Sequence, residues 1–483
     1  MLRTLLIGFA LALAGPLAAQ PYLPDPPGET CTPRSIGNPA ALLDRAVTAA
    51  GIDGSGVVHA QLADIVAQPF QSDRPYPPFF SVVLNRELWY DLDTGTERVE
   101  GTTTYVGQGP FPNPTMLRGS TTLQMERGEQ RVQVPTRFGP SRELNAWAVL
   151  HDWRAGESVQ MVAECLYRDF PRIVLERTTE NGPERLYLDP ESGLPVKLDR
   201  EEEHILWGQT RVEYLYSTWI AAGDGMMPGA SFRIVDGLVE TSRTVADVEQ
   251  VITEDVPDLA LSDDATVIPS QPDFMPDTVR VAEDVYLLVT RAYTEAVALV
   301  NDTVYVFDAT TEEARALADM ERIAQLFPGD HPVVVVVTDL AWPHVAGVRA
   351  WVSKGATVLS HTTSEPFLRR VVEHRWTRQP DRLEQRRSSA TFRFVGVDEA
   401  VELGNGRIRV APIGGIGSEG ALMAYLPDVD FLWASDYIQT LQTPSTYAAE
   451  VIQAAERLGW TPETVSAQHL PLVPWSDVVQ ANS

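Results

Sequence analysis

The stretch Thr338–Gly347 reads TDLAWPHVAG and connects a predicted buried strand, Val333–Thr338, to a predicted helix, His344–Lys354. The continuous apolar residues of the strand imply a sheet that is buried on both faces, as a layered α/β architecture requires. Pro343 presets its own φ and lacks an N–H, so it can serve as the first residue of the following helix. The stretch is therefore predicted to be a strand-to-helix loop in a layered α/β structure.

On both sides of this loop, short apolar strands alternate with helices. The pattern predicts a helix at Thr311–Leu326 and strands at Val285–Thr290, Ala296–Leu299, Thr303–Phe307 and Thr357–Ser360.

The loop resembles the metal-binding loop of the metallo-β-lactamase superfamily, whose motif is Thr-His-x-His-x-Asp-His-x-x-Gly. In this chain Asp339, Ala341 and Pro343 stand where that family places two histidines and an aspartate, and His344 is the histidine of the motif that remains. The resemblance implies a fold that was built around the chemistry of a metal ion, with most of the ligands in this loop removed.

Further segments resemble the same family in the same order along residues 280–475. They are Val304–Asp308, Gly355–His361, Gly417–Pro427, Phe431–Asp436 and Gln468–Pro471. The resemblance implies an αββα fold in which Asp308 braces the loop, Asp436 is the bridging carboxylate and His469 is the last histidine. Gly417 stands where the family has another metal-binding histidine.

The family's first metal site would need the histidines that Asp339, Ala341 and Gly417 replace, and alanine and glycine have no donor atoms. The second site keeps three of its four positions, namely His344, Asp436 and His469. Two histidines and one carboxylate with an open position suffice for a mononuclear catalytic zinc or iron. Asp339 could then act as a substitute ligand or as the base that accepts a proton from water.

The alternative is that no metal binds. His344, Asp436 and His469 would then persist as a hydrogen-bonded cluster after catalysis was lost, because hydrolysis depends on the geometry of the complete ligand set. The sequence leaves both alternatives open.

The region from 36 to 260 consists mainly of short alternating segments, which indicate an antiparallel sheet. Within it Leu186–Lys197 reads LYLDPESGLPVK and is predicted to form a hairpin. Together with Trp219 and Asp236-Gly237, this segment resembles the half-barrel of periplasmic lipoprotein carriers. The resemblance implies a curved sheet whose apolar concave face could carry an apolar ligand; a β-rich accessory domain that binds nothing is the alternative.

Residues 1–19 have the layout of a secretory signal peptide: Arg3, an apolar run over Leu5–Ala14, and small residues before a cleavage point after Ala19. We therefore predict export, to the periplasm, with no stable membrane span after cleavage; an uncleaved anchor is the rival interpretation. The predicted organisation is a signal peptide at 1–19, a β-rich half-barrel-like domain at 20–261, a proline-rich linker at 262–276 and a metallo-β-lactamase-fold domain at 277–483.

Composition narrows the possible partners. A formal net charge of -28 over 483 residues works against binding to nucleic acids.

Cys31 and Cys165 could form one disulfide in an oxidising compartment or remain two buried thiols. The segment from Arg369 to Arg393 holds eight arginines and three acidic residues. It could receive an anionic substrate, or it could be a solvated or interdomain face that pairs with acidic stretches such as Glu201–Glu203.

The sequence thus predicts an α+β two-domain protein and three possible functions. The leading one is a hydrolase relative that has become non-catalytic or weakly active, a pseudoenzyme that acts by binding. The second is a metal-dependent hydrolase with a mononuclear His/Asp/His site, and the third is a carrier of an apolar ligand. The small molecule or apolar ligand itself is not identified by the sequence.

Overall fold

The computed structural model describes residues 29–483, except for 35–36, 68–78, 106–107, 129, 135–140, 157–158, 180, 252–255, 269–273, 292 and 443. The predicted signal peptide and part of the predicted linker lie outside the described residues. Within the described part of the chain, no helix is long and apolar enough to cross a membrane.

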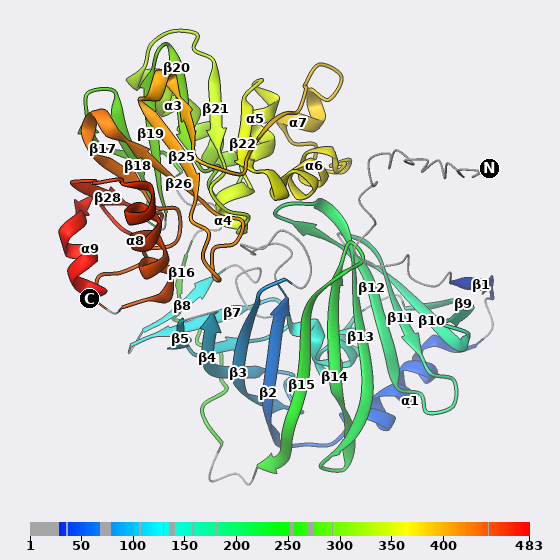
Figure 1. Cartoon of the computed structure of the whole chain (residues 1–483). Coiled ribbons are helices and arrows are strands. Elements are labelled where there is room, and N and C mark those ends of the chain that lie inside the picture. Colours follow the sequence, from blue (N-terminus) through cyan, green and yellow to red (C-terminus); the bar gives the residue numbers. More distant parts are fainter. Residues whose placement is uncertain are drawn as a thin grey trace, which may run out of the picture.

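The first half of the chain forms one large curved sheet (Figure 1). The sheet is 16-stranded, and the described strands pair in the order β1-β9-β10-β11-β12-β13-β14-β15-β2-β3-β4-β6-β7-β8-β16, with β5 also on β4. The strands are β1 (Thr30–Pro33), β2 (Val57–Ala67), β3 (Ser81–Asp91), β4 (Glu97–Tyr105), β5 (Gln108–Pro112), β6 (Met116–Arg118), β7 (Leu123–Arg127), β8 (Gln130–Val134), β9 (Gln160–Tyr167), β10 (Phe170–Thr179), β11 (Gly182–Leu188), β12 (Pro195–His204), β13 (Gly208–Ala222), β14 (Gly225–Val235), β15 (Leu238–Val251) and β16 (Thr266–Val267).

Two helices pack on this sheet, α1 (Pro39–Ala50) and α2 (Ala146–Ala155). The side chain of Asn38 caps α1 by accepting a hydrogen bond from the N–H of Ala40. On α2, Trp147 and Trp153 are fully buried. Both helices pack against β14, so they fill the space over one face of the sheet with large apolar side chains.

The predicted hairpin at Leu186–Lys197 is confirmed. It joins β11 to β12, with Leu188 paired to Pro195. The N–H of Gly193 donates to the carbonyl of Asp189 at 2.9 Å, and Gly193 has φ 81°, which glycine adopts without strain.

Cys31 and Cys165, for which the sequence left a disulfide or two buried thiols open, are joined in a disulfide between β1 and β9.

The second half of the chain forms two further sheets. The 7-stranded sheet contains β17 (Asp277–Ala282), β18 (Val285–Val289), β19 (Thr294–Val300), β20 (Thr303–Phe307), β21 (Val333–Val336), β22 (Thr357–His361) and β23 (Arg393–Val397). The 6-stranded sheet contains β24 (Val401–Leu403), β25 (Ile408–Pro412), β26 (Leu422–Leu426), β27 (Phe431–Trp433), β28 (Thr464–Ser466) and β29 (Val473–Pro474).

Helices cover the outer faces of these two sheets. They are α3 (Glu313–Leu326), α4 (Trp342–Val345), α5 (Val348–Ser353), α6 (Glu365–Glu373), α7 (Arg382–Gln385), α8 (Thr446–Leu458) and α9 (Trp475–Ala481). Short 3-10 turns lie at Thr362–Ser364, Gly404–Gly406 and Pro427–Val429 in this half, and at Arg142–Leu144 in the first half.

Three clusters of buried side chains define the layers of the second half. One cluster lies between the two sheets and joins residues such as Phe307 and Leu359 to Trp433. A second packs the other face of the 7-stranded sheet against α3, α5 and α6. A third packs the 6-stranded sheet against α8 and α9. The order of layers is therefore helix, sheet, sheet, helix.

Most elements predicted around the loop agree with the structure. The predicted helix His344–Lys354 differs: it is two short helices, α4 and α5, separated by Ala346 and Gly347. Gly347 packs closely on the backbone of Ala309, where a Cβ would lie 3.0 Å from the carbonyl oxygen. The N–H of Gly347 donates to the carbonyl of Ala309 at 2.9 Å and not to that of Pro343, so the helical hydrogen-bond pattern is interrupted there. Pro343, which was predicted to be the first residue of the helix, is the second residue of α4 and still lies in its first turn.

The two halves share one continuous hydrophobic cluster, so the structure does not separate them into independent cores. At the junction Trp207, in the β12–β13 turn, is fully buried. Its ring centroid lies 5.8 Å from that of Phe367, and the Arg370 guanidinium lies 4.9 Å from the ring. The change from the first sheet to the second falls between β16 and β17, within the predicted linker.

The arginine-rich segment contributes to this junction. Arg370 pairs with Asp236 at 2.5 Å and Arg378 pairs with Glu201 at 3.1 Å, so both connect the second half to the first. The interpretation of this segment as a face between the two halves is confirmed for these two arginines.

Replacing Trp207 with alanine should lower the free energy of unfolding by about 3–5 kcal/mol, because it leaves a cavity where the two halves meet. Urea denaturation followed by circular dichroism measures the change. The matched control is Phe170→Ala, because Phe170 is 62% exposed; its effect should stay within about 0.5 kcal/mol. Equal effects of the two substitutions would contradict the junction described here.

Candidate functional site

The candidate site is assembled at the carboxyl ends of two parallel strands, β20 and β21. Asp308 directly follows β20, and Asp339 lies in the loop that follows β21. His344 comes from α4, the short helix that ends this loop. Segments distant in the sequence therefore bring the three side chains together.

His344 is completely buried between two carboxylates. Its Nδ1 lies 3.1 Å from Oδ2 of Asp308, and its Nε2 lies 3.4 Å from Oδ2 of Asp339. Both distances are within ion-pair range, but neither ring nitrogen has the direction of a good hydrogen bond. Both carboxylates are also buried, so the three groups form one charge cluster away from solvent.

Other polar groups hold the two carboxylates in place. Asp308 accepts hydrogen bonds from the N–H and the hydroxyl of Thr338, at 2.9 and 2.6 Å, and from the indole of Trp433 at 3.2 Å. Asp339 accepts one from the hydroxyl of Ser435 at 2.8 Å. The expected role of Asp308 in bracing the loop is confirmed by its bonds to Thr338.

The backbone of the loop is fixed in the same way. The N–H of Ala309 donates to the carbonyl of His344 at 2.8 Å, and that of Thr311 donates to the carbonyl of Pro343 at 3.0 Å. The side chain of Gln468 adds a bond to the same Pro343 carbonyl at 3.3 Å. Protein groups therefore satisfy the carbonyls of Pro343 and His344.

The electrostatic setting favours a charged imidazole. Burial lowers the pKa of His344, but the carboxylates of Asp339 and Asp308 outweigh burial and raise this pKa to about 10. Burial also raises the pKa of Asp339, with His344 opposing and Asp308 adding to the rise. At neutral pH the cluster therefore holds an imidazolium beside carboxyl groups.

Asp436 and His469 form a second, more exposed pair. Nε2 of His469 lies 3.4 Å from Oδ1 of Asp436, and their side chains are 35% and 28% exposed. Burial raises the pKa of Asp436 to about 7, while the charge of His344 works against this rise. Gln439 donates a hydrogen bond to the other carboxylate oxygen at 3.2 Å.

The structure does not bring His344, Asp436 and His469 together as one ligand set. In the described part of the chain, the only group of three or more His, Cys, Asp or Glu residues with ligand atoms within 4.8 Å of one another is Glu29, Cys31 and Cys165. The two cysteines of that group are already in a disulfide. The predicted residues instead form two pairs, His344 with Asp339 and His469 with Asp436, which does not fit one shared metal ion.

The position of the missing histidine at Gly417 is filled by α8. A Cβ at Gly417 would lie 2.2 Å from the ring of Tyr447, so no side chain fits there. The N–H of Gly417 and the hydroxyl of Ser418 both donate to Glu450, at 3.0 and 2.7 Å.

Sequence reasoning missed the groups that complete the site, namely Thr338, Trp433, Ser435, Tyr447 and Glu450. Ser435 directly precedes the predicted Asp436, but nothing in its identity indicates its φ of 55° or its bond to Asp339. Tyr447 and Glu450 could be associated with Gly417 only through the tertiary fold.

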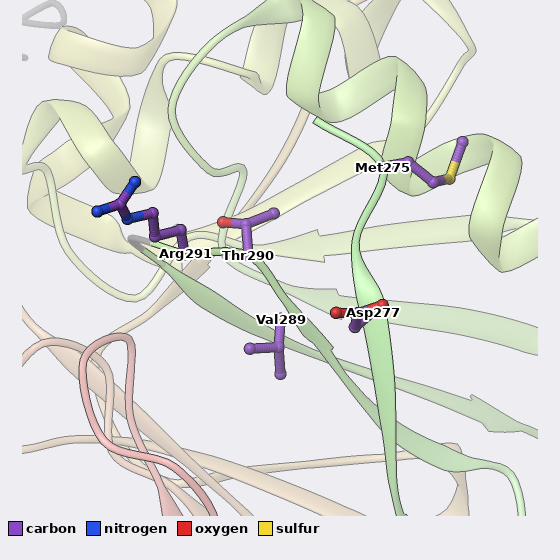
Figure 2. Close-up of a pocket in the computed structure, with 5 residues that line it drawn as sticks. All are labelled: Met275, Asp277, Val289, Thr290 and Arg291. Atoms are coloured by element: carbon purple, nitrogen blue, oxygen red, sulfur yellow. The ribbon is translucent and has the colours of Figure 1, made fainter. Parts of the chain in front are cut away.

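The structure also contains surface pockets away from these residues. One of about 370 Å³ is lined by Met275, Asp277, Val289, Thr290 and Arg291 (Figure 2). Another, of about 340 Å³, is lined by residues that include Ile52, Leu92, His151 and Arg154. Neither of these two pockets includes His344, Asp436 or His469.

No protein-family model and no curated protein matches this sequence. Similar solved structures include the DIM-1 metallo-β-lactamase, at 12% identity and a TM-score of 0.34, and a metallo-β-lactamase from Erythrobacter litoralis, also at 12% and 0.34. TMB-1 follows at 14% identity and 0.33. Each match covers 43% of this chain and 94% of the other chain.

Replacing His344 with alanine should lower the free energy of unfolding by about 3–5 kcal/mol, because it leaves buried carboxylates without their cation. His469→Ala is the matched control and should cost under about 1 kcal/mol, because its ion pair is partly exposed. Chemical denaturation of both variants measures the difference. Equal, small effects would show that His344 is not the charge partner of Asp308 and Asp339.

The same cluster predicts a pH dependence. Because the pKa of His344 is raised from its ordinary 6.5 to about 10, its stabilising effect is complete below pH 6.5 and is lost as pH rises through about 10. The stability difference between wild type and His344→Gln should therefore shrink across this window. Denaturation series at several pH values measure it, and a difference that grows with pH would contradict the assigned charge.

Proposed function

We propose that this chain is a metallo-β-lactamase-fold protein that no longer performs metal-dependent hydrolysis and acts by binding. The support for the fold is the order of helix, sheet, sheet and helix in the second half, together with a loop of the family's spacing between β21 and α4. The proposed loss of hydrolysis is supported by the replaced ligands at Asp339, Ala341, Pro343 and Gly417.

One observation carries this proposal: His344 is buried with each ring nitrogen beside a carboxylate. A histidine that binds a metal must be neutral and must direct one nitrogen at the ion. Here a carboxylate lies beside each ring nitrogen, which favours the protonated ring. The positive charge of this ring balances the carboxylates, as the charge of a metal ion otherwise would. Protonation of His344 therefore replaces the ion as the source of positive charge.

The mononuclear hydrolase alternative requires His344, Asp436 and His469 to lie about 2.0–2.2 Å from a single point. Their arrangement in two separate pairs does not support it. If zinc or iron did bind, the ion would supply a water of lowered pKa, and the side chain of His344 would first have to leave its carboxylates.

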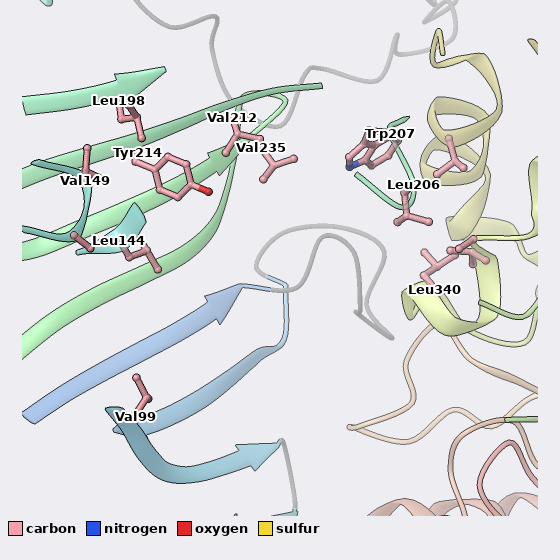
Figure 3. Packing of buried hydrophobic residues seen from close by; sticks show 14 of the residues in the cluster. Val99, Leu144, Val149, Leu198, Leu206, Trp207, Val212, Tyr214, Val235 and Leu340 are labelled. Atoms are coloured by element: carbon pink, nitrogen blue, oxygen red, sulfur yellow. The ribbon is translucent and has the colours of Figure 1, made fainter. Parts of the chain in front are cut away.

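The carrier alternative requires an enclosed apolar cavity. Over the face of the first sheet, the buried cluster contains Leu144, Val149, Leu198, Val212, Tyr214 and Val235 (Figure 3). In the described residues, side chains from α2 and the sheet fill this space. This packing counts against an apolar ligand inside the first half.

Export to the periplasm belongs to the same proposal. It rests on the signal-like residues 1–19, and the disulfide between Cys31 and Cys165 supports it because disulfides persist in oxidising compartments. The proposed binding role would then be carried out outside the cytoplasm.

Metal analysis tests the proposal. Wild type, His469→Ala and His344→Ala/His469→Ala are incubated with zinc or iron, passed through a desalting column and analysed by mass spectrometry for bound metal. We expect equal, near-zero content in all three. His469→Ala is included because the double variant is expected to be unstable. About one equivalent in wild type that is lost in His469→Ala would support a mononuclear site instead.

A further inference from the structure

The pocket of about 340 Å³ in the first half lies where three elements meet. Its walls are the turn after α1, the turn between β3 and β4, and the C-terminal turn of α2. We call it the α1–α2 pocket. The residues that line it are Ile52, Asp53, Gly54, Leu92, Asp93, His151, Arg154 and Ala155.

Hydrogen bonds and close packing hold these walls together. The N–H of Gly56 donates to Oδ2 of Asp93 at 3.1 Å, and the N–H of Leu92 donates to the carbonyl of Gly56 at 3.0 Å. These bonds join the turn after α1 to the β3–β4 turn. His151 of α2 packs on Gly95 in the same β3–β4 turn, where a Cβ would lie 2.7 Å from Nδ1 of the imidazole. Contacts among all three elements therefore fix the backbone around the pocket.

Charged groups of both signs line the pocket without pairing. They are the carboxylates of Asp53 and Asp93 and the guanidinium of Arg154, and all three side chains are exposed. None of them forms an ion pair with another described residue. Oδ2 of Asp53 accepts a hydrogen bond from the hydroxyl of Thr48 at 2.9 Å, and Oδ2 of Asp93 accepts the one from Gly56. The two carboxylates are thus oriented by the protein, while their charges remain available to a ligand.

The pocket also offers apolar surface and a negative electrostatic setting. Ile52 and Leu92, which are 4% and 8% exposed, contribute apolar side chains to its lining. Both α1 and α2 end at the pocket, and the C-terminal end of a helix favours positive charge. The two carboxylates and one guanidinium give the lining a net charge that a ligand of opposite sign would balance.

We infer that the α1–α2 pocket binds a basic amino acid, a small molecule with two cationic groups and one carboxylate. The two cationic groups face Asp53 and Asp93, and the ligand carboxylate faces the planar guanidinium of Arg154. The carbon chain of the ligand covers the apolar surface of Ile52 and Leu92. Each charged group of the lining then has a partner.

Other classes of ligand match this lining less well. A simple anion is repelled by the two carboxylates, and a diamine brings no partner for Arg154. A metal ion needs several converging ligand atoms. Among the described residues, the one group of three or more His, Cys, Asp or Glu side chains close enough for an ion is Glu29, Cys31 and Cys165, outside this pocket.

This inference goes beyond the proposed function and does not rest on it. The lining residues all belong to the first half, and the candidate site with His344 lies in the second. A failure of ligand binding at the pocket would therefore leave the metal analysis unchanged.

Isothermal titration of the intact protein with L-lysine tests the inference, at neutral pH and low ionic strength, because salt screens exposed charges. Two control ligands each lack one recognition group. Norleucine is lysine without the side-chain ammonium, and cadaverine is lysine without the carboxylate. We expect saturable binding of lysine, with norleucine and cadaverine each bound at least about fivefold more weakly.

Substitutions then assign the charged groups. Asp93→Asn keeps an oxygen that can accept from Gly56 but removes the charge, so it should weaken binding of lysine by at least about threefold. Arg154→Gln should weaken binding of lysine and not that of cadaverine, because only lysine has a carboxylate. The matched controls are Asp169→Asn and Arg168→Gln, two exposed positions in the β9–β10 turn and outside the pocket lining. Both should leave lysine affinity unchanged.

The inference is overturned if lysine does not bind saturably, or if norleucine or cadaverine binds as tightly as lysine. It is also overturned if Arg154→Gln leaves lysine affinity unchanged, or if Arg168→Gln weakens it as much as Arg154→Gln does. The comparison of the three ligands uses wild type alone, so it decides the inference even if a variant fails to fold.

Discussion

The arrangement of the candidate site depends on a buried histidine held between two carboxylates. Asp308 and Asp339 lie within the protein core, where unpaired charges are too costly to persist. A protonated His344 supplies the positive charge that these carboxylates need, and Asp339 and Asp308 in turn raise the pKa of His344. Trp433 and Ser435 donate to the same oxygens that face His344, while Thr338 and the N–H of Ala341 donate to the other two. These hydrogen bonds connect the loop after β21 to the ends of β20 and β27.

The arrangement of the loop could be predicted because its signals are local or periodic. The apolar run before Thr338, the proline at the start of α4 and the turn residues of the β11–β12 hairpin each determine their own local structure. The pairing of side chains could not be predicted. His344, Asp436 and His469 were assigned to one site by resemblance, but which partner each selects depends on distant residues. Ser435 and Tyr447 illustrate this dependence, because their contacts exist only once α8 and β27 are in place.

The junction between the halves connects the first sheet directly to the second half of the chain. Trp207 packs into the second half, and Arg370 and Arg378 pair with carboxylates of the first. These contacts join β12 and the turns that follow β12 and β14 to α6 and the segment after it. The buried cluster is continuous across this junction, which the sequence of neither half could have indicated alone.

The protonation state of His344 tests the central claim most directly. Nitrogen NMR of protein labelled at histidine, with the His344 signals assigned by comparison with His344→Gln, reports whether each ring nitrogen carries a proton. The account predicts that both nitrogens remain protonated at a pH well above the ordinary pKa of 6.5, and that adding zinc changes neither signal. A neutral ring at that pH, or a zinc-dependent shift of one nitrogen, would contradict it.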